Sequence, residues 1–121
     1  MYHLLQFNDV DWKPHPTIPG VMTKVFEGRD TNPQADVLLA QVLPGGTLPW
    51  HVHELASETA YIVQGAGVLL CAPDSDHRDT ASRNDLALNS VATIQAGVWH
   101  SVVNAADVPL ILYAFHTPPT L

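Results

Sequence analysis

Turn-forming residues interrupt this sequence so often that long helices have little room. Ten prolines and seven glycines are spread along 121 residues, and no stretch longer than about ten residues keeps the apolar spacing of a helix. A chain of this length closes one hydrophobic core but not two. We therefore predict an all-β fold in a single domain.

The candidate strands are short and closely spaced, which favours a barrel or jelly roll. They are predicted at about 21–27, 36–43, 48–53, 58–64, 67–72, 86–88, 91–94, 98–104 and 108–116. Residues 1–20 are rich in turn formers and are predicted to be an arm that packs on a barrel made by residues 21–121. The polar segment from Pro73 to Asp85 is predicted to be an exposed loop.

Charge and composition exclude several classes of partner. The formal net charge is −7, and the five lysines and arginines are scattered, so no basic stripe could neutralise nucleic-acid phosphates. No apolar run approaches the roughly 20 residues of a membrane span. The single cysteine, Cys71, lies in an apolar run and is expected to be a buried thiol without a role. We expect a cytoplasmic protein with neither a nucleic-acid nor a membrane partner.

Three histidines and one glutamate have the spacing of a metal site built on strands. His51 and His53 are two residues apart, so on a strand both imidazoles point to one face. Glu58 follows after a stretch short enough to start an adjacent strand beside them. His100 is distant in sequence but follows a glycine turn, and closure of a barrel could bring it alongside. Together, these four residues predict a site for one divalent ion.

Two runs of the sequence resemble the two motifs of the cupin family. The first is Gly45, five residues, His51-Val52-His53, four residues, Glu58, six residues and Gly65. The second is Gly97, two residues, His100, three residues and Asn104, with Asn89 and Gln95 where the motif usually has glycine and proline. Asparagine tolerates a left-handed turn conformation, so Asn89 can still make the bend.

The resemblance implies a small single-domain cupin, an RmlC-like jelly roll or double-stranded β-helix, with His51, His53, Glu58 and His100 as metal ligands. Some cupins lack a metal, and the alternative is that these side chains only bond to one another. Burying three imidazoles and a carboxylate without a cation is costly, which favours the metal. The mixed nitrogen and oxygen set suits Fe, Mn, Ni, Co or Zn, and the lack of thiolates argues against a closed structural zinc site.

Three classes of function remain open at this point. Open coordination positions favour a metalloenzyme acting on a small anionic or oxygen-rich substrate, and the resemblance implies dioxygenase-like, isomerase-like or decarboxylase-like reactions. A non-catalytic ligand-binding or sensor module is the alternative, because no general acid or base stands out. Glu54 and Tyr61 have the parity that faces away from the ion, and His116 is expected at the surface, with a place in the barrel mouth as its alternative.

The third class is a structural or accessory barrel that forms a homodimer. Its interface would come from the apolar last strand together with the arm. No catalytic residue is assigned on the sequence alone.

Overall fold

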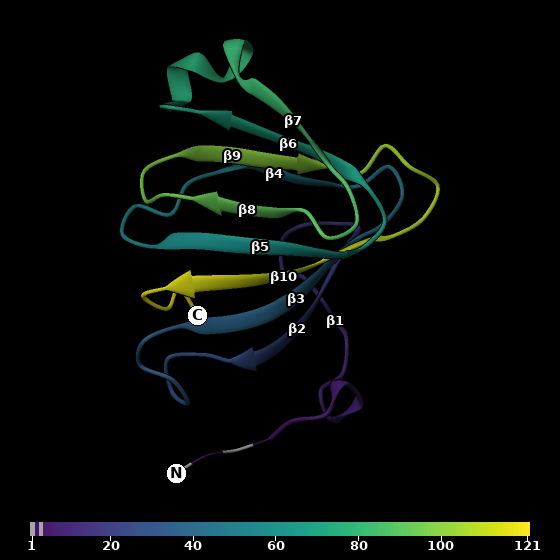
Figure 1. Ribbon diagram of the computed structural model, residues 1–121, viewed down its shortest axis with the longest axis vertical. Coiled ribbons are helices and arrows are strands. Elements are labelled where there is room, and N and C mark those ends of the chain that lie inside the picture. The colour runs from purple at the N-terminus through teal and green to yellow at the C-terminus, as the bar shows by residue number, and fades with distance from the viewer. Residues whose placement is uncertain (1, 3) are drawn as a thin grey trace.

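Two antiparallel sheets enclose the hydrophobic core of the molecule (Figure 1). The computed structural model describes residues 2 and 4–121. The six-stranded sheet has the order β1-β2-β3-β10-β5-β8, and the four-stranded sheet has the order β4-β9-β6-β7. The elements are η1 (Phe7–Asp9), β1 (Lys13–Pro14), β2 (Val21–Glu27), β3 (Asp36–Val42), β4 (Thr47–His51), β5 (Ser57–Gln64), β6 (Gly67–Ala72), η2 (Ser75–Thr80), β7 (Ser82–Leu86), β8 (Val91–Ile94), β9 (Trp99–Val103) and β10 (Leu110–Thr117). The predicted all-β jelly roll is confirmed.

The interior changes from apolar to ionisable along the strands. On β10 the inward side chains begin with Leu110 and Leu112 and continue through Ala114 to His116. The neighbouring strands β3 and β5 place Asp36 and Glu58 in register with His116. One end of the space between the sheets is therefore a hydrocarbon core, and the other end is lined by groups that can carry charge.

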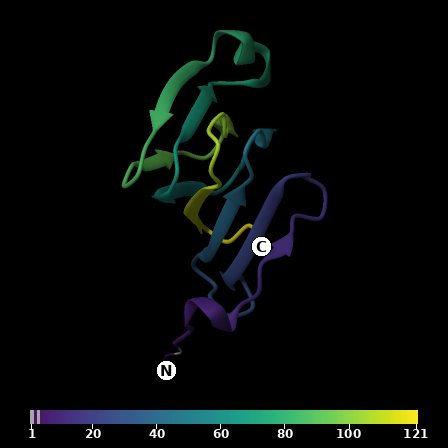
Figure 2. The ribbon, with the colours of Figure 1, turned by 90° about the vertical axis from the view of Figure 1, so that its right-hand side faces the viewer.

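The prediction of one exposed loop from 73 to 85 was wrong, because this segment contains η2 and β7. Strand β7 pairs with β6 at the edge of its sheet and exposes its residues 82–85 to solvent. An edge strand that is polar on both faces has no apolar alternation, so the sequence showed no strand signal. The strand predicted at 86–88 shares only Leu86 with the strand observed. In Figures 1 and 2, this β6-η2-β7 segment and the N-terminal segment lie at opposite ends of the molecule.

Two turns show why their residues suit the fold. Asn89 has a φ of 70°, so the left-handed conformation predicted for it is confirmed. Gly65 has a φ of 82°, and a Cβ added there would lie 2.7 Å from the Pro109 carbonyl oxygen. Only glycine meets both conditions, which lets the turn after β5 pass close to the start of β10.

The N-terminal residues contact the outer face of the six-stranded sheet. Lys24 on β2 is only 3% exposed, and its ammonium donates to the Phe7 carbonyl oxygen at 2.8 Å and lies 3.5 Å from the centre of the Phe7 ring. The Trp12 ring packs edge-on against Phe7. These contacts support the division into an arm, residues 1–20, and a barrel, residues 21–121. The division stays a prediction, and residues 1 and 3 of the arm lie outside the described part.

Within the described part of the chain, no helix combines the length and the apolar character that crossing a bilayer requires.

Candidate metal centre

Three imidazoles meet at the end of the four-stranded sheet. His51 on β4 is the register partner of His100 on β9, and their ring centres lie 4.1 Å apart. The predicted strand to residue 53 stops at His51, so His53 lies just beyond it. The His53 ring centre is still only 5.1 Å from that of His51 and 5.4 Å from that of His100. The structure thus gathers the three predicted histidines.

Backbone carbonyls fix the orientation of two of these rings. His51 Nδ1 lies 2.7 Å from the Pro49 carbonyl oxygen, and His100 Nδ1 lies 2.9 Å from that of Val98. A carbonyl oxygen only accepts, so each Nδ1 must carry the proton. The Nε2 atoms of both neutral rings are then left with a lone pair, which is the form that a metal ligand needs.

Glu58 faces these rings from β5, on the opposite sheet. Its Oε1 lies 3.6 Å from His53 Nε2 and its Oε2 lies 3.8 Å from His100 Nε2, too long for hydrogen bonds. Among the described residues, these two buried Nε2 atoms have no hydrogen-bond partner. Ligand atoms bound at about 2.0–2.2 Å to one ion would be about 3–3.5 Å apart, so small shifts would suffice. The donor set fits a divalent ion.

His116 also belongs to this centre, and its expected surface position was wrong. The side chain is buried, with 6% of the residue exposed. Its Nε2 lies 2.5 Å from Glu58 Oε1, and its Nδ1 lies 2.5 Å from Asp36 Oδ1. The alternation along β10 already placed residue 116 on the same face as Leu110 and Leu112. Sequence reasoning did not single out Asp36, which looked like an ordinary polar residue at the start of a strand.

The surroundings shift the pKa values of the histidines in opposite directions. Burial lowers the pKa values of His51 and His100 below the usual 6.5. For His116, burial opposes the charge, but the Glu58 and Asp36 carboxylates outweigh it and raise the pKa. Burial would raise the pKa of Glu58, yet its hydrogen bond with His116 and the nearby imidazoles hold it well below its usual value. The site therefore favours the charged form of His116 and the neutral forms of His51 and His100.

The metal-free protein is expected to be most stable near pH 6.5. His51 and His100 have lowered folded pKa values, so they oppose folding as the pH falls below the unfolded value of 6.5. His116 has a raised folded pKa, so its contribution is complete below 6.5 and is lost as the pH rises through the folded value. Urea unfolding from pH 5 to pH 9 would test this, and His116→Gln should abolish the decline on the alkaline side.

Other groups near the site face away from it or are unsuited to it. Tyr61 lies on the outer face of β5, where its hydroxyl donates to Asn89 Oδ1 at 2.7 Å. Glu54 is exposed. Cys71 is the register partner of His100 across β6 and β9, but burial raises the pKa of its thiol. The thiol therefore stays protonated and is a poor ligand at neutral pH.

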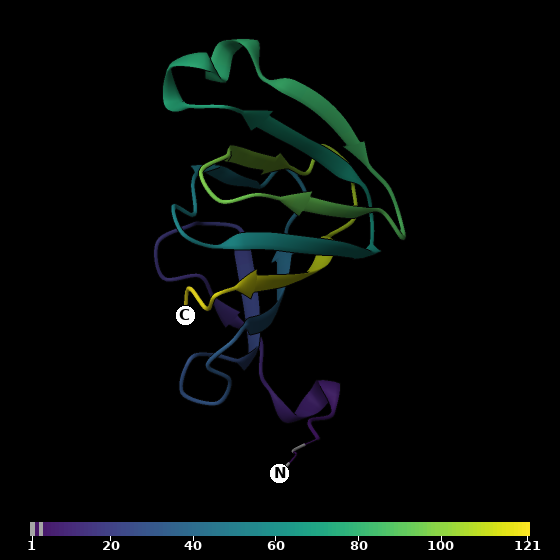
Figure 3. The same cartoon turned by 60° about the vertical axis from the view of Figure 1, so that its left-hand side comes forward.

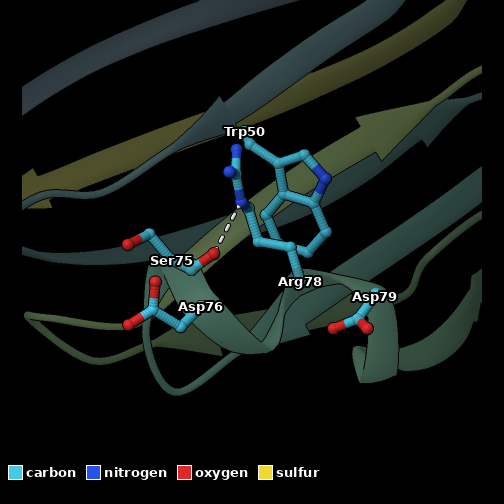
Figure 4. A pocket seen from close by; sticks show the side chains of 5 residues that line it. All are labelled: Trp50, Ser75, Asp76, Arg78 and Asp79. Carbon is cyan, nitrogen blue, oxygen red and sulfur yellow. Dashed lines mark hydrogen bonds between the residues drawn. The ribbon is translucent and has the colours of Figure 1, made fainter.

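A surface pocket elsewhere on the four-stranded sheet contains none of the four predicted ligands. Its lining comes from Trp50 on β4 and from residues of η2, shown in Figure 4. Arg78 is held by a hydrogen bond from its Nε to the Ser75 carbonyl oxygen, and its guanidinium lies 5.9 Å from the Trp99 ring centre. The contacts indicate that η2 packs on the outside of this sheet.

Comparisons with known proteins agree with the fold and the motifs. A model of the cupin domain matches residues 38–116, and the chain therefore belongs to the cupin family. It is 27% identical over 89 residues to the uncharacterized protein YrkC of Bacillus subtilis strain 168, a match that covers 74% of this chain and 47% of YrkC. It is 28% identical over 79 residues to the auxin-binding protein ABP19b of Prunus persica, covering 64% of this chain and 35% of that protein. The chain thus spans less than half of either curated relative.

A solved structure from Thermotoga maritima, described as a predicted oxalate decarboxylase, has the same fold. It superposes with a TM-score of 0.81 at 17% identity, covering 96% of this chain and 99% of that one. At this identity the similarity establishes the architecture alone, so the reaction must be argued from the site.

Proposed function

We propose that the protein holds one divalent transition-metal ion through Nε2 of His51, His53 and His100 and a carboxylate oxygen of Glu58. The observation that carries this proposal is the pair of buried Nε2 atoms, on His53 and His100, without any hydrogen-bond partner among the described residues. Such atoms cost free energy unless a ligand satisfies them. Fe, Mn, Ni, Co and Zn all suit this donor set.

We further propose that the site serves a metalloenzyme acting on a small anionic or oxygen-rich molecule. A bound ion would supply Lewis acidity toward a carbonyl or carboxylate group, or a centre for reaction with O₂. The chain itself supplies neutral imidazoles and one carboxylate, which leave a divalent ion with a net positive charge that attracts such a molecule. The Thermotoga maritima neighbour is described as a predicted oxalate decarboxylase, which is compatible with the decarboxylase-like reaction; dioxygenase-like and isomerase-like reactions are the alternatives on this fold.

The decisive experiment starts from protein purified without added metal. Elemental analysis should find close to one transition-metal ion per chain, and the loaded protein should turn over a member of a panel of diketones, phenols, keto acids and keto sugars. Metal content near zero after incubation with each of the five metals would contradict the metal site. Full metal content with no turnover across the panel would contradict the enzyme and leave the binding function.

A ligand-binding or sensor function is the second candidate, and one observation favours it. Glu54 and Tyr61 are exposed, and the buried His116 is already engaged by two carboxylates, so none of these three candidates offers a free proton donor at the metal position. The relative from Prunus persica is itself called an auxin-binding protein. Tight binding of one metabolite without conversion, measured by calorimetry on loaded protein, would favour this function over catalysis.

We also propose a cytoplasmic homodimer formed through the outer face of the six-stranded sheet. Aromatic rings of Tyr113 and Phe115 stack there with centres 6.1 Å apart, and Tyr61 and Val91 beside them are exposed. A contiguous apolar face of this kind is characteristic of an interface. A dimeric barrel whose main role is structural or accessory is compatible with the same surface.

Charges placed on this face are expected to separate the dimer. Introducing Tyr61→Asp and Val91→Asp together should convert the sedimenting species from dimer to monomer, because two buried unpaired carboxylates would oppose association. Val108→Asp, at an exposed position just before β10, is the matched control and should leave the dimer intact. A wild-type protein that sediments as a monomer at micromolar concentration would contradict the interface.

A further inference from the structure

Three ionisable side chains form a continuous row across the six-stranded sheet. Asp36 on β3, His116 on β10 and Glu58 on β5 are register partners, and their side chains are joined by contacts of 2.5 Å on both sides of the imidazole. Of these three residues, only Glu58 was predicted from the sequence to be a metal ligand. The row connects the predicted metal carboxylate to a fully buried second carboxylate.

Asp36 accepts several hydrogen bonds in addition to its contact with the His116 imidazole. With 0% of its surface exposed, it accepts hydrogen bonds on Oδ2 from the Thr120 amide at 2.6 Å, the Thr120 hydroxyl at 2.9 Å and the Leu121 amide at 3.0 Å. These donors come from the chain that turns back after β10 (Figure 3). Because these bonds fix the carboxylate through Oδ2, the position of Oδ1 is fixed as well, and Oδ1 sets the orientation of the His116 ring.

The charge pattern determines what His116 does to Glu58. Its Nδ1 must donate to Asp36, because an ionised carboxylate only accepts. Its Nε2 faces a second carboxylate at 2.5 Å, which requires a proton between the two groups. The imidazolium thus donates at both ends, and Glu58 Oε1 is engaged in a charge-assisted hydrogen bond. Oε2, 3.8 Å from His100 Nε2, is the oxygen left without such a bond to His116.

We propose that His116, fixed by Asp36, is a positioning residue that occupies Oε1 of Glu58 and thereby presents Oε2 to the metal as a single-oxygen ligand. This inference rests on the metal site proposed above. It assigns the Asp36–His116 pair a purpose that neither the cupin motifs nor the four ligands require. A carboxylate restrained in this way cannot swing to bind the ion through both oxygens, so coordination positions stay open for a small ligand.

A competing arrangement uses the same atoms differently. His53, Glu58 and His116 also lie close enough together to hold an ion by themselves, with ligand atoms within 4.8 Å of one another. In that arrangement His116 Nε2 would bind metal directly and its hydrogen bond to Glu58 would be lost. The two arrangements predict different bonding at one nitrogen atom, which can be observed directly.

The first experiment uses the wild-type protein, labelled with ¹⁵N-histidine and loaded with ¹¹³Cd²⁺. Scalar coupling to cadmium is expected for Nε2 of His51, His53 and His100, while His116 Nε2 keeps its proton and shows no coupling. Coupling to His116, or two bound ions per chain, would overturn the positioning role. A wild-type protein that binds no cadmium and no zinc would contradict the metal site itself, a distinct result.

The second experiment measures zinc affinity by competition with a chelator. His116→Leu should weaken zinc binding about 10–100-fold, which is the usual effect of removing a residue that hydrogen-bonds to a metal ligand. It should also shift the Co²⁺ absorption spectrum. His116→Gln, which keeps an N–H donor, should restore most of the affinity and the spectrum. His77→Leu, at an exposed histidine on η2, is the matched control and should change neither.

Clear results would overturn the inference. Unchanged affinity and spectrum in a folded His116→Leu protein would show that Glu58 needs no such support. A loss far beyond 100-fold that His116→Gln does not rescue would identify His116 as a ligand. If His116→Leu does not fold, because it leaves Asp36 buried without its partner, the wild-type cadmium couplings and the His116→Gln affinity decide the question.

Discussion

Replacing His53 with alanine is expected to cost the protein most of its bound metal. An apparent binding free energy of about 10–16 kcal/mol for a four-ligand zinc site implies roughly 3 kcal/mol for each ligand, or about a hundredfold in affinity. His51 and His100 are committed to their own positions, and the next residue, Glu54, is exposed. The nearest other imidazole is His116, whose ring centre lies 4.7 Å from that of His53, but both of its nitrogens are already engaged by the Asp36 and Glu58 carboxylates. Metal content after dialysis and the zinc dissociation constant are the measurements.

The control for this change is a histidine outside the site. His15 near β1 accepts hydrogen bonds from the amides of Thr17 and Ile18 and does not contact the three imidazoles. His15→Ala should therefore retain full metal occupancy. Full occupancy in His53→Ala as well would refute the assignment of His53 as a ligand.

Replacing Asn104 with alanine is expected to give the largest loss of stability away from the ionisable row. Asn104 is fully buried, and its Nδ2 donates to the carbonyl oxygens of Val42 and Val108, each at 2.9 Å. Its Oδ1 accepts from the Ala106 amide at 3.0 Å. Each buried group left unsatisfied costs about 1–3 kcal/mol, so a loss of about 2–4 kcal/mol is expected from a total that is typically about 5–15 kcal/mol.

Chemical denaturation of metal-free protein would measure this loss. Asn84→Ala is the matched control, because Asn84 lies on the exposed strand β7 and its amide makes a longer bond, of 3.2 Å, to the Leu69 carbonyl oxygen on β6. Its expected cost is below about 1 kcal/mol. Equal destabilisation by the two changes would mean that Asn104 does not secure the loops it joins.

Several strands were predictable because clusters of turn-forming residues separate short segments rich in apolar residues. Strand β2 was predicted with its observed bounds, and β6 and β8 likewise. The polar strand β7 was not, because pairing at an exposed edge depends on backbone hydrogen bonds that leave no trace in side-chain chemistry. The left-handed Asn89 was predictable because few residue types tolerate that conformation.

The candidate site was predictable only in part, for a related reason. The spacing of His51, His53 and Glu58 and the glycine turn before His100 identified residues that the structure brings together. Asp36 was missed, and His116 was expected at the surface with the barrel mouth only as its alternative, because the meeting of the two depends on the register between β3, β10 and β5. Register between distant strands is set by the whole sheet, and a polar residue at a strand end looks the same whether it faces solvent or the barrel mouth.

The polar surface of β7 has a consequence for how the molecule associates with its own kind. A terminal strand with unpaired amides and carbonyls can recruit strands from other molecules, and apolar side chains along it would favour such growth. Ser82, Arg83, Asn84 and Asp85 place charge and hydrogen-bonding groups there instead. The four-stranded sheet therefore ends in an edge strand that resists pairing with strands of other molecules. Hydrophobic replacements along β7 would favour aggregation through this edge.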